Sequence, residues 1–156
     1  MLKIIYTSRL RSPMSSAELV ALTQAAEVKN RKLGITGLLL ASPHGFLQYL
    51  EGASKPLIKL MGSIARDPRH YDVIILEKKT TSQRLFPQWS MNSLAVDVKD
   101  LAHMQSSIRG NGQALQVMAS SVMRLAENES RNVDLQLMLQ DLAKACGRPH
   151  LDSQLF

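Results

Sequence analysis

The stretch Gly34–Gly52, GITGLLLASPHGFLQYLEG, carries two apolar runs that are separated by a turn sequence. The first run, Ile35–Ala41, is almost uniformly apolar, as in a strand that is covered on both faces. Ser42-Pro43-His44-Gly45 supplies turn residues, and the strand pattern resumes at Phe46–Leu50. The stretch therefore predicts a β-hairpin with a loop of about four residues.

Gln48 lies on an otherwise apolar face of this hairpin. Side chains alternate across a strand, so Gln48 shares its face with Phe46 and Leu50. A buried amide needs hydrogen-bond partners for its donors and for its acceptor. Backbone or another polar side chain could supply them, so Gln48 alone leaves a structural role and a ligand-binding role open.

Two elements are expected before the hairpin. Leu2–Thr7 alternates as a strand and puts Tyr6 on an apolar face. Ser15 and Glu18 form a capping box that starts a helix, and Gly34 ends that helix. Asn30 is the polar member of its inner face, which comprises Leu19, Leu22, Ala26, Asn30 and Leu33.

A second helix and two strands are expected after the hairpin. Ser54 is the expected cap of the helix, and Pro68 follows its end. Its buried stripe comprises Leu57, Leu60, Met61 and Ile64, and a charged cluster of Arg66, Asp67, Arg69 and His70 follows. Val73–Leu76 is a strand that could continue to Lys79. Trp89, Met91 and Ser93 alternate in a short fifth strand that reaches Val96.

This order predicts an α+β fold with a ferredoxin-like β-α-β-β-α-β-β sheet and two helices on one face. Residues 98–156 show helical periodicity, as in Leu101, Met104 and Ile108. We expect these C-terminal helices to cover the other sheet face, where Ile5, Leu39, Leu47 and Tyr49 would otherwise be exposed. The predicted division is a domain at 1–97 and a helical extension or output region at 98–156.

Composition restricts the class of protein. The 156 residues have no apolar run of the roughly 18 residues that would suggest a membrane span, and the N-terminus MLKIIYTS does not resemble a signal peptide. The single cysteine, Cys146, is typical of a reducing compartment, so we expect a cytoplasmic protein without a membrane partner.

A net charge of +6 leaves nucleic acid open as a partner. The basic residues are scattered, however, and three Tyr, three Phe and one Trp offer few rings for base stacking. This pattern argues against nucleic-acid binding. The alternative function is a ferredoxin-like module that binds nucleic acid or another anionic partner through its basic surface.

Tyr6, Asn30 and Gln48 all point, by periodicity, into the layer between sheet and helices. Leaving such groups unpaired costs roughly 1–3 kcal/mol each. They could bond to one another, or they could surround a ligand held between the helices, with Leu22 and Ile64 against its flat faces.

Several motifs together resemble the BLUF domain, a blue-light sensor that holds a flavin, over about residues 2–95. They are Tyr6 in the first strand, Asn30 followed by GITGLLL, FLQYLEG with Gln48, DPRH at Asp67–His70, and FPQWSM with Trp89 and Met91.

The resemblance implies a non-covalently bound flavin, usually FAD, which FMN or riboflavin can replace in a recombinant preparation. It implies photochemical roles for Tyr6, Gln48, Trp89 and Met91. Light would drive electron transfer from Tyr6 with proton movement through Gln48. The Gln48 amide would rotate, change tautomer, or both, and give a red-shifted state. The implied flavin-binding residues are Tyr6, Leu22, Asn30, Gln48, Ile64, Arg66, Asp67, Arg69 and His70.

Enzymatic turnover and a metal site are not expected. The chain has no phosphate-binding Gly-rich loop, no Cys-x-x-Cys and no nucleophilic Ser-His arrangement, and its four histidines lack metal-ligand spacing. With no effector domain recognised in the sequence, we expect the signal to pass through the C-terminal helices to an effector protein in trans or to a homo-oligomer.

Overall fold

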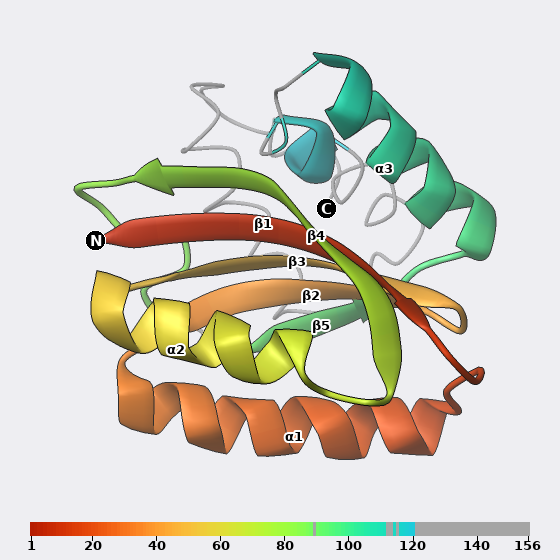
Figure 1. Cartoon of the computed structure of the whole chain (residues 1–156), viewed down its shortest axis with the longest axis horizontal. Coiled ribbons are helices and arrows are strands. Elements are labelled where there is room, and N and C mark those ends of the chain that lie inside the picture. Colours follow the sequence, from red (N-terminus) through yellow and green to blue (C-terminus); the bar gives the residue numbers. More distant parts are fainter. Residues whose placement is uncertain (89, 112–113, 115, 121–156) are drawn as a thin grey trace, which may run out of the picture.

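The structure is a computed structural model that describes residues 1–88, 90–111, 114 and 116–120. A five-stranded sheet lies between two helices on one side and a third helix on the other (Figure 1). In chain order the elements are β1 (Leu2–Leu10), α1 (Ser16–Leu33), β2 (Thr36–Ser42), β3 (Gly45–Gly52), α2 (Ser54–Ala65), β4 (His70–Thr80), β5 (Asn92–Ala95) and α3 (Val98–Asn111). The predicted α+β, ferredoxin-like fold is confirmed.

The sheet has the strand order β4-β1-β3-β2-β5. β3 is antiparallel to both β1 and β2, β4 is antiparallel to β1, and β5 is parallel to β2. Because Tyr6 of β1 stands opposite Gln48 of β3 in the register, the two polar side chains project next to each other from the same face. The centre of the sheet therefore carries the polar pair that the alternation predicted.

Each face of the sheet has its own apolar core. The face toward α1 and α2 buries Ile4, Leu39, Phe46 and Leu50 against Leu57, Leu60 and Met61 of α2. The opposite face buries Ile5, Leu38, Leu40, Leu47 and Tyr49 against Leu101, Met104 and Ile108 of α3. The predicted cover for the second face is thus confirmed for α3, while the segments predicted after residue 120 lie outside the described residues.

Leu39 corrects the predicted division of side chains between the faces. We expected it on the face covered by the C-terminal helices, but it pairs with Gln48 across β2 and β3 and packs toward α1 and α2. β2 is buried along its whole length, so its sequence lacks the apolar–polar alternation that would assign each residue to a face.

The hairpin loop is shorter than predicted. Ser42 and Gly45 pair as strand residues, which leaves only Pro43 and His44 in the turn. The Ser42 hydroxyl closes this turn, since it accepts from the His44 N–H and donates to the Gly45 carbonyl, each at 3.3 Å. Two residues that the sequence assigned to the loop, Ser42 and Gly45, therefore belong to the strands.

The ends of α1 are as predicted, but the start of α2 is not. Ser15 and Glu18 form the complete capping box, and Gly34 ends α1 in the left-handed conformation with φ of 64°. The N-cap of α2 is Ala53, without a side-chain bond, and Ser54 is the first helical residue. The backbone closes this turn instead, through the bond from Leu57 N–H to the Ala53 carbonyl at 3.2 Å.

The outer strands also differ from prediction. β1 reaches Leu10 and β4 starts at His70, because the two strands pair from Leu2 and Thr80 to Leu10 and His70. Most side chains of β4 are exposed, so no alternation marked its extent. Met91 precedes β5, which is confined to Asn92–Ala95, and Trp89 lies outside the described residues. Among the helices that are described, none combines the length and hydropathy needed to cross a membrane.

Candidate functional site

A cavity of about 240 Å³ lies between the sheet and the two helices α1 and α2. Its walls are mostly apolar, and they include Leu22, Ala26, Leu39, Phe46, Leu60 and Ile64. Tyr6, Asn30 and Gln48, all buried, contribute polar atoms to the interior. An apolar cavity with a few directed polar groups is the usual form of a small-molecule site.

Gln48 connects three elements inside the cavity. Its Oε1 accepts a hydrogen bond from the Tyr6 hydroxyl, and its Nε2 donates to Met91 Sδ at 3.3 Å. Burial raises the pKa of Tyr6, and the negative charge of Asp67 raises it further, so the phenol keeps its proton at neutral pH. The amide thus lies between a neutral proton donor on β1 and a thioether just before β5.

Asn30 connects α1 to the segment before β5. It is buried at the end of α1, and its Nδ2 donates to the Ser90 carbonyl at 3.1 Å. The backbone carbonyl of Asn30 accepts from the Ile35 N–H at 2.9 Å, where the chain leaves the helix for β2. Asn30 therefore holds the backbone beside Met91 against the cavity.

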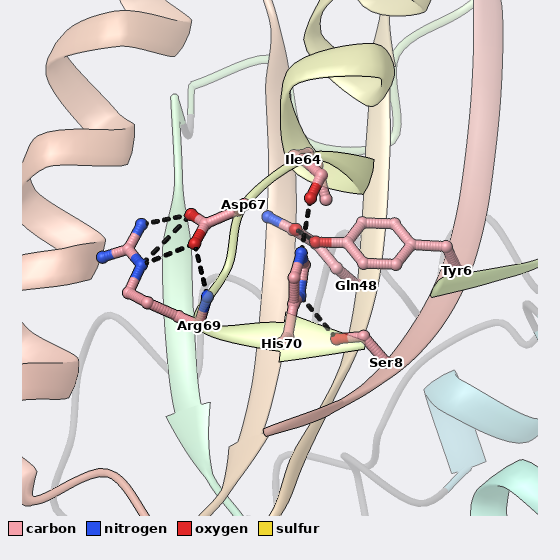
Figure 2. A network of polar contacts seen from close by, with 7 residues as sticks. All are labelled: Tyr6, Ser8, Gln48, Ile64, Asp67, Arg69 and His70. Atoms are coloured by element: carbon pink, nitrogen blue, oxygen red, sulfur yellow. Dashed lines mark hydrogen bonds and ion pairs between the residues drawn. The ribbon is translucent and has the colours of Figure 1, made fainter. Parts of the chain in front are cut away.

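Charged groups lie where α2 ends and β4 begins (Figure 2). Arg69 binds both carboxylate oxygens of Asp67, with a shortest contact of 2.5 Å. The hydrogen bond from Arg69 lowers the pKa of Asp67 to about 2, from an ordinary value of 3.8. Lys29 of α1 also lines the cavity, so the lining includes one acid and two cations besides His70.

His70 is buried between three elements at the same end (Figure 2). Its Nε2 lies 2.5 Å from the Ile64 carbonyl, and its Nδ1 lies 3.0 Å from the Ser8 hydroxyl. Because a carbonyl can only accept, Nε2 carries the hydrogen. His70 thereby joins the last turn of α2 to β1 and β4.

The structure brings most of the predicted site residues together around this cavity. Tyr6, Leu22, Asn30, Gln48, Ile64, Asp67, Arg69, His70 and Met91 all line it. Arg66 does not: it is exposed at the end of α2, and its guanidinium lies over Gly62. Trp89 lies outside the described residues. The roles predicted for Arg66 and Trp89 stay predictions.

Sequence reasoning missed other residues of the lining, among them Met14, Lys29, Leu39, Phe46, Leu60 and Ser63. Three of these carried a signal: Phe46 shares the strand face of Gln48, Lys29 precedes Asn30, and Leu60 belongs to the buried stripe of the second helix. Met14 lies in the connection between β1 and α1, where no periodicity marks which residues turn inward.

Chemically, the arrangement suits a flat, largely apolar ligand with polar edges. The two amides offer donors and acceptors to such an edge, and the small side chains of Ala25 and Ala26 leave room beside α1. Lys29 and Arg69 suit an anionic extension of the ligand, although Arg69 already shares its charge with Asp67.

Comparison with known proteins places this site in a family. Residues 1–92, more than half of the chain, match the family BLUF, described as sensors of blue-light using FAD. The photoactivated adenylate cyclase subunit beta of Euglena longa is 35% identical over 91 residues, 58% of this chain but only 11% of that protein.

Two solved structures agree. BlrP1 of Klebsiella pneumoniae, with FMN and cyclic diGMP, is 38% identical at a TM-score of 0.57, over 61% of this chain and 26% of that chain. The dark-state structure of BlrB, a BLUF protein, is 31% identical at a TM-score of 0.59, over 76% of this chain and 89% of that chain. The chain therefore belongs to the BLUF family of blue-light sensors that use FAD.

Proposed function

We propose that this chain is a blue-light photoreceptor whose flavin ring lies in the cavity between the sheet and the helices α1 and α2, where the Gln48 amide acts as the switch. One observation carries the proposal: the Tyr6 hydroxyl, the Gln48 amide and the Met91 thioether form a continuous contact along the cavity wall. An amide with a purely structural role could have the same two partners, but it would not need an open cavity beside it.

The residues present fit a flavin. Asn30 and Gln48 supply amide groups for the polar edge of the ring, and Leu22 and Ile64 supply apolar surface for its faces. Lys29 and Arg69 are lining cations that suit a phosphate group, and we keep Arg66 as a further candidate for it. His70 is proposed to shape the cavity wall, because its two ring nitrogens already bond to Ile64 and Ser8. FAD is the proposed cofactor because the family is described by it, and FMN or riboflavin can replace it in a recombinant preparation.

A bound flavin would supply blue-light absorption and an excited state that accepts an electron. Tyr6 is the proposed electron donor of the chain, and its hydroxyl proton already lies on a hydrogen bond to Gln48 Oε1. Because burial keeps the phenol neutral before light, electron loss and proton transfer to Gln48 can occur together. Trp89 is proposed to contribute from the segment before Met91.

The Gln48 amide can change its bonding without changing its packing, because its oxygen and nitrogen ends are nearly the same size. Rotation would direct Nε2 toward Tyr6 and Oε1 toward Met91 Sδ. A thioether can accept but cannot donate, so the rotated oxygen would lose a donor within this network. This asymmetry favours the dark arrangement and gives the switched amide a reason to revert.

We propose that the output runs through the segment after Met91. Met91 precedes β5 by one residue, and β5 leads within a few residues to α3 at Val98. Gln105 of α3 also donates to Thr7, the neighbour of Tyr6 on β1. Residues 1–97 would then be the sensor and 98–156 the output region, acting without turnover on an effector protein in trans, or through self-association.

Filling the cavity tests the proposal. Ala26→Phe introduces a ring into the space between α1 and the sheet, whereas Ala21→Phe adds the same ring on an exposed position of α1 that does not line the cavity. We expect wild type and Ala21→Phe to purify with about one flavin per chain and Ala26→Phe to be folded but colourless. Full flavin content in Ala26→Phe would refute the assigned position. A colourless wild type with salt-sensitive affinity for RNA or DNA would favour the alternative function.

A further inference from the structure

Glu51 is a completely buried carboxylate on the sheet face opposite the cavity. Its Oε1 accepts from the Thr36 hydroxyl at 2.9 Å and from the Phe86 N–H at 2.7 Å. Its Oε2 accepts from the Tyr49 hydroxyl at 2.9 Å and from the Leu85 N–H at 2.8 Å. Both oxygens are thus fully engaged, and two of the four donors are backbone groups of the connection between β4 and β5.

That connection, residues 81–91, is fastened at the same place by the two residues beside Leu85. Arg84 donates to the Gly34 carbonyl at 2.6 Å and to Thr36 Oγ1 at 2.9 Å. Phe86 is buried and stacks edge-on against Tyr49, with ring centroids 5.4 Å apart. We call Glu51 and its four hydrogen-bond donors the Glu51 clamp.

The other end of the same connection forms part of the cavity. Ser90 accepts from Asn30, and Met91 accepts from Gln48, as described above. Gln48 and Glu51 belong to one strand, β3, and their side chains leave it on opposite faces. One strand therefore holds the connection at two points: a fixed carboxylate on one face binds Leu85 and Phe86, and the switching amide on the other face binds Met91.

We propose that Glu51 is a positioning residue of the photocycle: its clamp sets the place of residues 84–86, and thereby seats Met91 against Gln48 and determines how long the switched amide persists. The inference rests on the proposed roles of Gln48 and Met91. It assigns to the clamp a kinetic effect that a purely structural anchor on the far side of the sheet would not have.

A carboxylate is needed because four donors converge on two oxygens. Glutamine in its place would present one oxygen and an NH2 group. The hydroxyl of Thr36 or Tyr49 could turn to accept from that NH2 group, but the backbone N–H of Phe86 or Leu85 beside it would face another donor. Such unpaired buried groups loosen the segment that they held. In a looser connection, Met91 can move aside when the Gln48 amide rotates, and water can reach that amide. Both effects lower the barrier to dark reversion.

The test compares Glu51→Gln with Glu77→Gln. Glu77 is a second buried carboxylate, which pairs with Lys3 at 3.0 Å and Lys79 at 3.5 Å and has no hydrogen bond to the described part of the connection. After a blue-light pulse, we expect Glu51→Gln to recover at least about fivefold faster than wild type, about 1 kcal/mol on the barrier. Glu77→Gln should recover at the wild-type rate, and both variants should retain flavin.

Two further variants separate positioning from general loosening. Arg84→Gln removes the bonds that fasten the residue next to Leu85 to Gly34 and Thr36, and it leaves the carboxylate unaltered. It should therefore accelerate recovery even where Glu51→Gln does not fold. In a Met91→Ala background, Glu51→Gln should change recovery by less than about twofold, because the contact through which it acts is gone. An undiminished effect in that background, or wild-type recovery in Glu51→Gln and Arg84→Gln, would overturn the inference. A wild type without a light response would instead refute the proposed function.

Discussion

Replacing Tyr6 with phenylalanine removes one oxygen atom from the cavity wall and leaves the ring in place. The lost hydroxyl is the donor to Gln48 Oε1, and both residues are buried, at 3% and 6% exposure. An acceptor left unpaired in such a site costs about 1–3 kcal/mol, which a domain of ordinary stability tolerates. We expect a folded, flavin-loaded protein with a lower free energy of unfolding.

The photochemical effect should be complete, not partial. Phenylalanine is a poor electron donor and has no hydroxyl proton to pass to Gln48, so the amide keeps its dark arrangement. The assay is the flavin absorption spectrum before and after blue light, together with urea unfolding. Tyr71→Phe is the control, since Tyr71 of β4 is an exposed tyrosine whose ring lies under the Arg11 guanidinium and does not line the cavity. A red shift of wild-type amplitude in Tyr6→Phe would refute the donor role.

Three further predictions concern the switch, the output region and the acid group. Gln48→Ala should bind flavin but lose the red shift, because no amide remains to rearrange; a retained shift in its spectrum would contradict this. Ending the chain after Asp97 removes α3 and exposes the apolar face that it covers, at about 1.5–3 kcal/mol for each large side chain uncovered. We expect reduced solubility but a preserved shift, and a soluble truncation without light response would be the contrary result. Because the pKa of Asp67 is lowered to about 2, its ion pair with Arg69 contributes stability above the ordinary value of 3.8 and loses that contribution as the pH falls toward 2. Asp67→Asn should therefore lose less unfolding free energy than wild type between pH 4 and 2. If the two proteins lost the same amount, the ion pair would not be the cause of the acid destabilisation.

Much of the fold and of the cavity could be predicted because local patterns and tertiary structure agree there. Alternation assigned Tyr6 and Gln48 to one face, helical spacing brought Asn30 to the same layer, and the capping box located α1. The register then explains why the prediction worked, since the pairing of β1 with β3 sets the two polar side chains opposite each other.

The sequence-based predictions were wrong or incomplete where a residue's position depends on contacts with distant parts of the chain. Ser42 pairs with Gly45 as a strand residue and its hydroxyl bonds within the two-residue turn, which its turn-like sequence does not reveal. Leu39 belongs to a strand buried on both faces, so nothing in its neighbours marks its direction. Phe86 is a core residue in an irregular segment, and its partner Glu51 looks in the sequence like a polar strand end. Such contacts join residues that are far apart in the sequence and leave no periodic pattern in it, so they are visible only in the folded structure.

The light-minus-dark absorption spectrum of the purified wild-type protein tests the account most directly, because it reports on the hydrogen bonds around the flavin. We predict a flavin band that shifts to longer wavelength under blue light and returns fully in the dark at a single rate. A protein that carries flavin but keeps the same spectrum in light and dark would contradict the role of Gln48 as a switch.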